Sequence, residues 1–560
     1  MNAPELMQEA SRLVRAGRHA EAAAVLAVLA GLMPGEAPVW CSLGMMRVAS
    51  GDLEGGEGAL REATALDPSH ADSLACLGML LATRQRAGEA EGFLGRAAAL
   101  APGRADVLYA YTRLLTESGR APEAVALLRA AIARHGAPGG AGGDRDPLLR
   151  SKLCMMLNYS GARPEEVFAA HIEYGRWLPP ARALPAAVDR DPARPLRVGY
   201  LSPDLREHAV AYFLEPLLEH RSRGDFSVFL YHAGAGGDAV TARLRGLADG
   251  WREVQPLSDE ETYQQIVADR IDVLIDLAGH TAGNRLPVMA LRPAPVQATY
   301  IGYPNTTGVP AIGSRFVDAT TDPEGSGADA LATERLVRLP GCFLCYRPFE
   351  GAPDPGPSPC RRDGHLTFCS FNSLAKLSEA TIAVWSRIVR ELPGSRLMLK
   401  GKGLADPAVA SRFASRFAVH GIGAERLELL SHTASTAEHM AAYQRADIAL
   451  DPFPYGGTTT TCEALWMGVP VISLAGERHA SRVGVSLLGA AGVPELVAAT
   501  GDLYIATALE LASNPERIAA LRAGLRGRVR ASPLCDAGAF VAAYEGALRA
   551  LWREWCSSPR

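Results

Sequence analysis

The sequence predicts an α superhelix of repeated helix pairs, followed by two α/β domains that each contain a parallel sheet. Three observations support this prediction. Prolines recur every 34 residues near the N-terminus, apolar strand-like runs alternate with helical segments further along, and an interval rich in proline, glycine and aspartate divides that alternation in two. A length of 560 residues allows two to four domains.

Four kinds of position repeat in the N-terminal part. They are a boundary proline (Pro34, Pro68, Pro102), a large apolar residue (Trp40, Leu74, Leu108), a small residue (Ala10, Gly44, Gly78, Thr112) and a turn residue (Gly17, Gly51, Gln85, Gly119). The period resembles the tetratricopeptide repeat, with about four units over residues 5–136. Such helix pairs stack into a curved solenoid whose concave groove usually binds a peptide or protein. We therefore predict a repeat domain over 1–136 with a protein or peptide partner; a plain scaffold or a dimer surface is the alternative.

A helical linker region is predicted over 137–193. A glycine-rich break, GAPGGAGGD at 136–144, comes first and indicates a flexible join. Apolar residues then return at helical spacing through 145–180, and five prolines between 179 and 195 mark the next boundary.

Two Rossmann-like domains are predicted after the linker, over 194–355 and 356–560. Strands that are buried on both faces read as continuous apolar runs, and nine such runs are present. They are 196–201, 226–231, 271–277 and 296–301 in the first domain, and 366–370, 396–399, 427–430, 446–450 and 470–474 in the second. Amphipathic helices from about 502 to 555 are expected to pack back on these domains. Ligands of open α/β sheets bind beyond the carboxyl ends of the strands, so we expect a cleft there.

The most informative stretch is DPFPYGGTTTTCEALWMG at 451–468. An apolar strand ends at its aspartate, two glycines allow a tight turn, and threonines lead into a helix. A helix N-terminus presents unpaired N–H groups and a partial positive charge, which suit phosphate. The hydroxyls of Thr458, Thr459 and Thr460 would add donors, and Glu463 would accept from a ribose hydroxyl. The alternative is an ordinary helix capped by threonine.

Polar residues at other strand ends point to the same cleft. Lys376 follows the first strand of the second domain, where it would neutralise a leaving diphosphate. His208 follows the first strand of the first domain, and histidine titrates in the range that suits a base acting on a hydroxyl. His280, Tyr303 and Pro304 follow later strands and are candidates for the acceptor or sugar side, although a lone strand-end histidine is more often structural.

Composition argues against several other classes of protein. The net charge of −4 is not that of a general nucleic-acid or membrane-surface binder. Most of the ten cysteines stand in apolar runs, as buried thiols of a reducing compartment do, and we predict no metal site. No apolar run is long enough for a membrane helix and the N-terminus lacks a signal-peptide core, so a cytoplasmic protein is expected.

Six separated motifs carry a resemblance to a known family. They are RPLRVGYLSPDLREHAVAYFLEP, IDVLIDLAGHTAGNR, LRPAPVQATYIGYPNTTG, TFCSFNSLAKLS, HTASTAEHMAAYQRADIALDPFPYGGTTTTCEALWMGVPVISL and GERHASRVGVSLL. Over about 145–545 the chain resembles the O-linked N-acetylglucosamine transferases and their SPINDLY-like relatives, which join tetratricopeptide repeats to a GT-B glycosyltransferase of the GT41 type. The resemblance implies an inverting, metal-independent transfer from a nucleotide sugar, UDP-GlcNAc being favoured, to serine or threonine hydroxyls of proteins. It implies no cofactor besides that donor.

The resemblance also implies roles for individual residues. His208 stands at the family's proposed catalytic base, and Lys376 at the lysine that contacts the diphosphate. The other positions that match the nucleotide-sugar site are Ser373, Ala434, Ser435, Thr436, His439, Thr458, Thr459, Thr460 and Glu463.

Four of these positions depart from the animal enzymes. Ser373 stands where they carry glutamine, Thr436 where they carry lysine, Thr458 where they carry histidine and Glu463 where they carry aspartate. Plant SPINDLY relatives are associated with fucose transfer from GDP-fucose. Two alternatives therefore stay open: the same fold with another nucleotide sugar or acceptor, and an inactive tetratricopeptide adaptor. The sequence does not decide between a monomer and a homo-oligomer.

Overall fold

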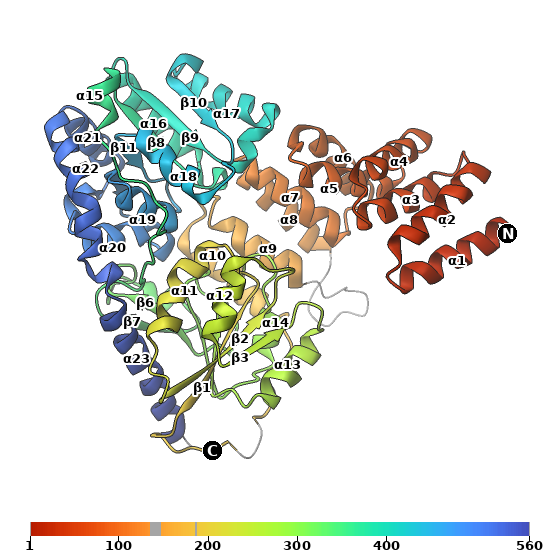
Figure 1. Ribbon diagram of the computed structural model, residues 1–560, viewed down its shortest axis with the longest axis horizontal. Coiled ribbons are helices and arrows are strands. Elements are labelled where there is room, and N and C mark those ends of the chain that lie inside the picture. The colour runs from red at the N-terminus through yellow and green to blue at the C-terminus, as the bar shows by residue number, and fades with distance from the viewer. Residues whose placement is uncertain (1, 135–146, 185–187, 559–560) are drawn as a thin grey trace. The chain divides into compact units, whose positions relative to one another are not determined.

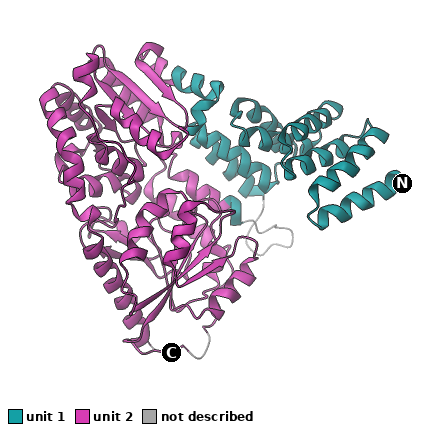
Figure 2. Cartoon of the chain, viewed as in Figure 1, with its two compact units in different colours: residues 1–149, 402–415 teal, residues 150–401, 416–560 magenta. Residues whose placement is uncertain are grey.

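The computed structural model describes residues 2–134, 147–184 and 188–558 (Figure 1). It divides into two compact units, one of residues 1–149 with 402–415 and one of residues 150–401 with 416–560 (Figure 2). The glycine-rich break predicted at 136–144 lies outside the described residues.

The repeats are four successive helix pairs. Their helices are α1 (Ala3–Arg15), α2 (His19–Leu32), α3 (Ala37–Ala49), α4 (Leu53–Leu66), α5 (Ala71–Thr83), α6 (Ala87–Leu100), α7 (Ala105–Glu117) and α8 (Ala121–Arg134). Every helix begins 34 residues after its counterpart, which confirms the predicted repeat. A Cβ added at Gly44 would lie 2.6 Å from Leu60 Cγ, and one at Gly78 would lie 2.7 Å from Leu94 Cγ. The small residue of the repeat is therefore required by the close approach of the two helices in a pair.

Gln85 stands at the turn where the other repeats carry glycine, and its backbone is left-handed, with φ of 59°. This conformation costs a residue with a side chain about 1–2 kcal/mol, while glycine costs about 0.5–1 kcal/mol in lost unfolded-state freedom. The Gln85 side chain is exposed, so its removal loses no buried contact. We expect Gln85→Gly to raise the unfolding free energy of the repeats by roughly 0.5–1 kcal/mol. Chemical denaturation would measure this gain, and Gly51→Ala, at φ of 92°, should show the opposite sign.

Residues 402–415 also belong to the first compact unit. Asp406 accepts a hydrogen bond from Gly88 N at 2.9 Å and from Ala408 N at 2.7 Å, at the start of α17 (Pro407–Val419). Arg412 forms an ion pair with Glu91 at 2.9 Å.

The linker region contains the expected helices, α9 (Pro147–Leu157) and α10 (Pro164–Gly175), and the second unit begins at Arg150 within α9. The first sheet of this unit has seven parallel strands in the order β3-β2-β1-β4-β5-β6-β7. The strands are β1 (Leu196–Ser202), β2 (Phe226–His232), β3 (Gly250–Glu253), β4 (Val273–Asp276), β5 (Val296–Thr299), β6 (Ser314–Asp318) and β7 (Arg335–Leu339), with helices α11 (Ala209–His220), α12 (Ala239–Leu247), α13 (Asp259–Ala268) and α14 (Leu286–Ala290). The four predicted strands of this domain are present. Strands β3, β6 and β7 were not predicted, because charged residues interrupt them and they do not read as apolar runs.

The second sheet has six parallel strands in the order β10-β9-β8-β11-β12-β13. Its strands are β8 (Thr367–Ser370), β9 (Arg396–Lys400), β10 (Leu427–Leu430), β11 (Ile448–Leu450), β12 (Val471–Leu474) and β13 (Val497–Ala498), and its helices are α15 (Pro359–Asp363), α16 (Glu379–Glu391), α17 (Pro407–Val419), α18 (Thr436–Ala442), α19 (Thr459–Trp466), α20 (Val483–Ala490), α21 (Gly501–Ala512) and α22 (Pro515–Arg530). All five predicted strands are present. In both sheets the first strand stands between the second and the fourth, as in the Rossmann fold, which confirms the two Rossmann-like domains.

The terminal helix α23 (Ala537–Ser557) returns to the first sheet. The Tyr544 ring lies 5.3 Å from that of Tyr300 and 4.9 Å from that of Phe316. Trp552 is fully buried and donates to Asp191 O at 3.1 Å. The C-terminal end of the chain therefore completes the first domain.

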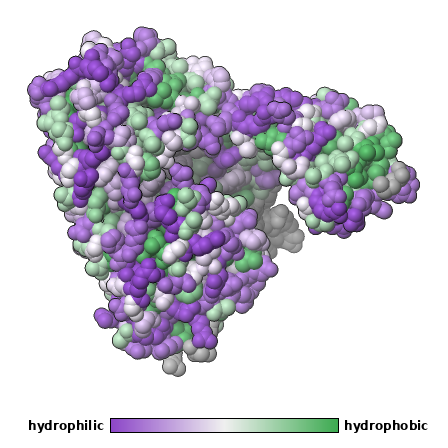
Figure 3. Space-filling model, in the orientation of Figure 1, coloured by the Kyte–Doolittle hydropathy of each residue, from purple (hydrophilic) through white to green (hydrophobic). Residues whose placement is uncertain are grey.

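The face of the protein in Figure 3 is mostly hydrophilic, with scattered apolar residues. Within the described residues, no helix is both long and apolar enough to span a membrane.

Candidate active site

Two loops of the second domain meet beside its central strands. One follows β8 and carries Lys376, and the other follows β11 and carries the turn before α19. Lys376 Nζ donates to Gly456 O at 2.6 Å and lies 4.1 Å from the centre of the Tyr455 ring. Because β8 and β11 are the neighbours at which the strand order reverses, these loops flank the position where Rossmann-type sheets bind ligands.

Asp451 holds the turn before α19 in place. Its carboxylate accepts from Gly457 N at 2.6 Å and from Ser473 Oγ at 2.7 Å. Burial raises the pKa of Asp451 to about 6, and these hydrogen bonds counteract that effect. Burial also lowers the pKa of Lys376 to about 8, although the charge of Asp451 opposes the change. The lysine is therefore a poorly solvated cation that an anionic ligand would stabilise strongly.

The three threonines begin α19 in different ways. Thr458 is the residue before the helix, and its side chain makes no capping hydrogen bond. The hydroxyl of Thr459 is buried and has no partner among the described residues. Thr460 donates to Asn372 Oδ1 at 3.0 Å. The first N–H groups of a helix have no partner within it, and at α19 the Thr459 hydroxyl also lacks a partner among the described residues, as is typical of a phosphate-binding helix start.

A partly buried chain of polar groups lies beside this helix. His439 Nδ1 is 2.8 Å from Lys400 Nζ, and His439 Nε2 is 3.0 Å from Glu463 Oε2. Lysine can only donate, so Nδ1 accepts and Nε2 donates to the carboxylate. Burial lowers the pKa of Lys400, and Glu463 opposes this shift. The histidine ring is thus fixed between one cation and one anion, in a defined orientation for a base or ribose.

The loop before α18 links the two α/β domains. Ser435 is the N-cap of α18 and accepts from Glu438 N at 3.2 Å, while Ala434 N donates to the same glutamate at 3.0 Å. Thr436 Oγ1 donates to Glu207 Oε1 of the first domain at 2.6 Å. Since Glu207 precedes His208, this bond brings the predicted base to the side of the nucleotide loops. Ser373 is exposed at the start of the Lys376 turn.

His208 is the N-cap of α11. Its Nδ1 accepts a long hydrogen bond from Val210 N at 3.3 Å and lies 3.7 Å from Asp204 Oδ2, while 39% of the side chain is exposed. Desolvation lowers the pKa of His208, and the Asp204 carboxylate opposes that shift. At neutral pH the ring is therefore uncharged and can accept a proton.

Comparison with known proteins identifies the family of this site. The model of Glycosyl transferase family 41 matches residues 184–345 and 361–544, more than half of the chain. The chain belongs to glycosyl transferase family 41.

Proteins of several organisms are similar to this chain. A probable UDP-N-acetylglucosamine–peptide N-acetylglucosaminyltransferase SPINDLY of Arabidopsis thaliana is 39% identical over 413 residues, which are 73% of this chain and 45% of that protein. The corresponding protein of Petunia hybrida is 43% identical over 66% of this chain and 40% of its own length. The chain thus spans less than half of these curated relatives. A mutant O-GlcNAc transferase of Thermobaculum terrenum superposes with a TM-score of 0.84 and 37% identity, over 93% of this chain and 98% of that one. This match confirms the repeat-plus-GT-B architecture.

Two predicted acceptor-side residues are buried in this family 41 chain. His280 is 3% exposed, and its ring nitrogens bond to Ser151 Oγ and Thr307 O, both at 2.9 Å. The Tyr303 hydroxyl is 2.7 Å from His171 Nε2, inside the same core. Their polar atoms are occupied by the protein, so we do not place them among the substrate-binding residues. Tyr303 and Pro304 both line a small cavity, which also receives Tyr455 and Thr458 from the second domain.

Cys154, His171 and His280 form a group of potential metal ligands, all buried. Both histidines already use both ring nitrogens in hydrogen bonds to the protein. Burial also lowers the pKa of His171 to about 4, lowers that of His280 and raises that of the Cys154 thiol, which keeps the group neutral. These contacts indicate that Cys154, His171 and His280 form a structural polar cluster in the core and not a metal site. The C-x-x-C pair Cys342 and Cys345 is likewise buried, and burial raises both thiol pKa values to about 12.

Sequence reasoning missed four residues whose contacts shape this candidate site. Lys400 is the last residue of β9, one position beyond the strand predicted at 396–399. A charged residue directly after an apolar strand could have indicated it. Asp451 and Tyr455 were noticed only as parts of a turn. Glu207 gave no signal, because its partner stands 229 residues later in the chain.

Proposed function

We propose that the chain is an inverting protein O-glycosyltransferase that moves N-acetylglucosamine from UDP-GlcNAc to serine or threonine hydroxyls of proteins. The observation that carries this proposal is the arrangement around α19. A desolvated Lys376 and the unpartnered Thr459 hydroxyl stand at a helix start on one domain, and His208 lies on the other, one residue from the Glu207–Thr436 bond. An inactive adaptor has no use for a desolvated cation, only partly offset by Asp451, beside an unpartnered hydroxyl.

The residues have separate tasks in the proposed reaction. The diphosphate of the donor binds at the helix start, and His439 and Glu463 hold the nucleoside. His208 takes the proton of the acceptor hydroxyl as its oxygen bonds to the anomeric carbon of the sugar. The bond from that carbon to the diphosphate breaks, and Lys376 and the α19 N–H groups stabilise the charge that leaves. Attack from the side opposite the leaving group inverts the anomeric centre.

The same contacts support metal independence. In many nucleotide-sugar enzymes a divalent ion neutralises the diphosphate. Here Lys376 and the helix start are placed to do so. We further propose that the repeat groove binds the protein acceptor, as solenoid grooves commonly do. The ten cysteines are all unpaired, which supports a reducing compartment such as the cytoplasm.

A panel of nucleotide sugars tests the proposal. The purified chain would be incubated with a protein extract as acceptor and with UDP-GlcNAc, UDP-galactose or GDP-fucose as donor. The released nucleotide and the glycosylated protein would be measured. We expect UDP-GlcNAc turnover with sugar on protein, unchanged by EDTA. If only GDP-fucose is turned over, the donor in our proposal is wrong. A strict requirement for Mn²⁺ would contradict the proposed mechanism. If no donor is turned over, the inactive adaptor is favoured.

The pH profile of kcat/KM should be a bell with an alkaline limb near pH 8. His208 acts unprotonated, and its pKa is lowered below the usual 6.5, so activity should rise with pH and level off by about pH 7. Lys376 acts protonated, and its pKa of about 8 in the free enzyme should make kcat/KM fall above that pH. Bound diphosphate raises this pKa, so kcat should hold to higher pH than kcat/KM. A Lys376→Arg enzyme serves as the control, because arginine stays charged and should remove the alkaline limb. A wild-type profile that stays flat to pH 10 would contradict the assignment.

A further inference from the structure

A small cavity lies where the first α/β domain meets the start of α19. It has a volume of about 30 Å³, enough for one or two groups of the size of water. Tyr455 and Thr458 line it from the second domain, and Arg315 of β6 lines it from the first. Thr458 is the residue directly before α19, so the cavity adjoins the helix start at which we place the diphosphate.

Arg315 reaches this cavity because of the register of its strand. It is only the second residue of β6, yet it is paired with Thr299, the last residue of β5. The Arg315 side chain therefore begins level with the carboxyl end of β5, and ligands of parallel sheets bind beyond that end of the strands. The residue is 5% exposed. The fold thus places a buried arginine of the first domain next to the nucleotide loops of the second.

The guanidinium of Arg315 has no partner in the described part of the protein. It forms no hydrogen bond and no ion pair there, and its Nη2 is enclosed without a partner. Nε and Nη1 also lack partners but are not enclosed, so they are the nitrogens that a group in the cavity can contact. Buried polar groups are nearly always paired, and a buried charge most of all. The free guanidinium therefore indicates an anionic ligand.

The charges around the cavity also favour an anion. Arg478, in the loop after β12, is partly buried, forms no ion pair with a described residue and has an unpartnered Nη1. Burial lowers the pKa of His171, and the charges of Arg315 and Arg478 lower it further, which places both arginines near this ring. Asp322 is the carboxylate on which the charge of Arg315 acts, but it already pairs with His479 at 2.5 Å. Positive charge is therefore in excess here.

We propose that Arg315 binds an oxygen of the β-phosphate of the nucleotide sugar, a role that rests on the function proposed above. One phosphate oxygen fits the cavity, where it accepts an N–H of Arg315 while the start of α19 holds the same phosphate from the other domain. A hydrogen bond between two charged groups is about twice as strong as a neutral one. Arg315 is thus a second cation for the diphosphate, besides Lys376, and it favours nucleoside diphosphates over monophosphates.

A comparison of diphosphates with monophosphates tests this role, because a monophosphate lacks the β-phosphate. Isothermal titration calorimetry with the purified chain would measure the affinities for UDP and UMP, and for GDP and GMP as a second pair. The wild type should prefer the diphosphate. Arg315→Met, which keeps a long side chain but removes the charge, should bind the diphosphate about 10- to 100-fold more weakly, as expected for one charged hydrogen bond. Its affinity for the monophosphate should stay unchanged.

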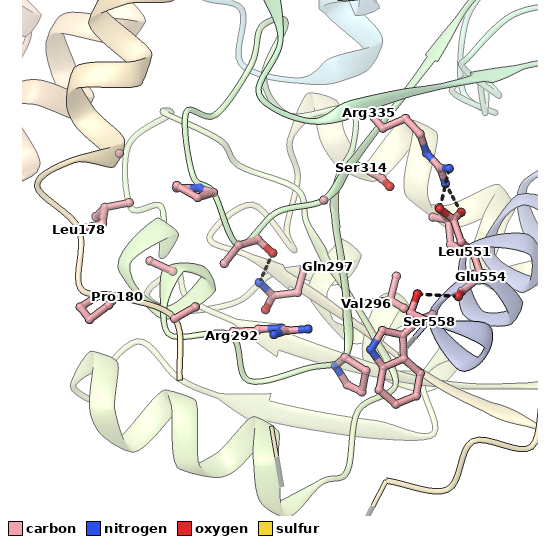
Figure 4. Close-up of a pocket in the computed structure, with 18 of the residues that line it drawn as sticks. Leu178, Pro180, Arg292, Val296, Gln297, Ser314, Arg335, Leu551, Glu554 and Ser558 are labelled. Carbon is pink, nitrogen blue, oxygen red and sulfur yellow. Dashed lines mark hydrogen bonds and ion pairs between the residues drawn. The ribbon is translucent and has the colours of Figure 1, made fainter. Parts of the chain in front are cut away.

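Arg335→Met is the matched control. Arg335 stands on the neighbouring strand β7, but its guanidinium pairs with Glu554 at 2.7 Å in a different pocket (Figure 4). Its replacement should change neither affinity. A crystal structure of the wild type with the bound diphosphate provides a test that needs no variant, and it should show an Arg315 nitrogen within hydrogen-bond distance of a β-phosphate oxygen.

Each result decides for or against the role of Arg315. A diphosphate preference that is reduced in Arg315→Met but not in Arg335→Met would support it. An unchanged preference in folded Arg315→Met, an equal loss of diphosphate and monophosphate binding, or a bound β-phosphate out of contact with Arg315 would each overturn it. Failure of the proposed donor looks different, because a chain that binds GDP and not UDP would still lose diphosphate affinity in Arg315→Met. A wild type that binds neither diphosphate would overturn both proposals.

Discussion

Replacing Lys376 with alanine is expected to lower kcat about 10²- to 10³-fold, the usual cost of one electrostatic partner of a leaving group. Lys376 donates to Gly456 O beside the start of α19, and burial has already removed much of its hydration. Negative charge on the diphosphate grows as the sugar bond breaks, so the lysine stabilises the transition state more than the bound donor. The loss should therefore fall on kcat more than on KM, as steady-state kinetics with UDP-GlcNAc would show.

Lys402→Ala is the matched control for this experiment, because Lys402 is an exposed lysine close in the chain. A thermal unfolding curve would establish that both variants fold. A folded Lys376→Ala enzyme with near wild-type kcat would mean that the lysine only anchors the turn.

Replacing His208 with alanine should have the other large effect, a fall in kcat of about 10²- to 10⁴-fold for transfer to protein. Hydrolysis of the donor by water depends less on a base, so it should fall less than transfer does. Measuring UDP release and protein glycosylation in the same reaction separates the two. His220→Ala is the control, because His220 is an exposed histidine on the same helix, α11.

Two outcomes would contradict the role of His208. One is transfer at the wild-type rate without it. The other is an equal loss of hydrolysis and transfer, which would indicate that the substitution disturbs donor binding through the neighbouring Glu207–Thr436 bond.

The parts of this protein that could be predicted from sequence are those that depend on local sequence patterns. A fixed period gave the repeats, and apolar runs gave the central strands, because these strands are buried on both faces. The start of α19 was predicted because its turn, its hydroxyls and its helix are consecutive in the chain. Lys376 was predicted for a related reason, since it lies six residues after the end of β8.

The rest depends on contacts between distant segments. The pairing of Lys400 with His439, and of Thr436 with Glu207, joins loops that no periodicity connects. Burial is also a property of the whole fold. His280 and Tyr303 follow strands as active-site residues do, yet α9 and α10 cover them, so their polar atoms are used inside the core. Strand β6 was missed because Arg315 and Asp318 break its apolar run, although both are buried.

The return of α23 to the first sheet has a consequence for protein synthesis in the cell. Tyr300 and Phe316 are made well before their cover, Tyr544, which follows Phe316 by 228 residues in the chain. At about 5–20 residues per second, the intervening stretch takes on the order of ten seconds or more to translate. During that time we expect the nascent first domain to keep this apolar face open to solvent, where chaperones can bind it until α23 has been made.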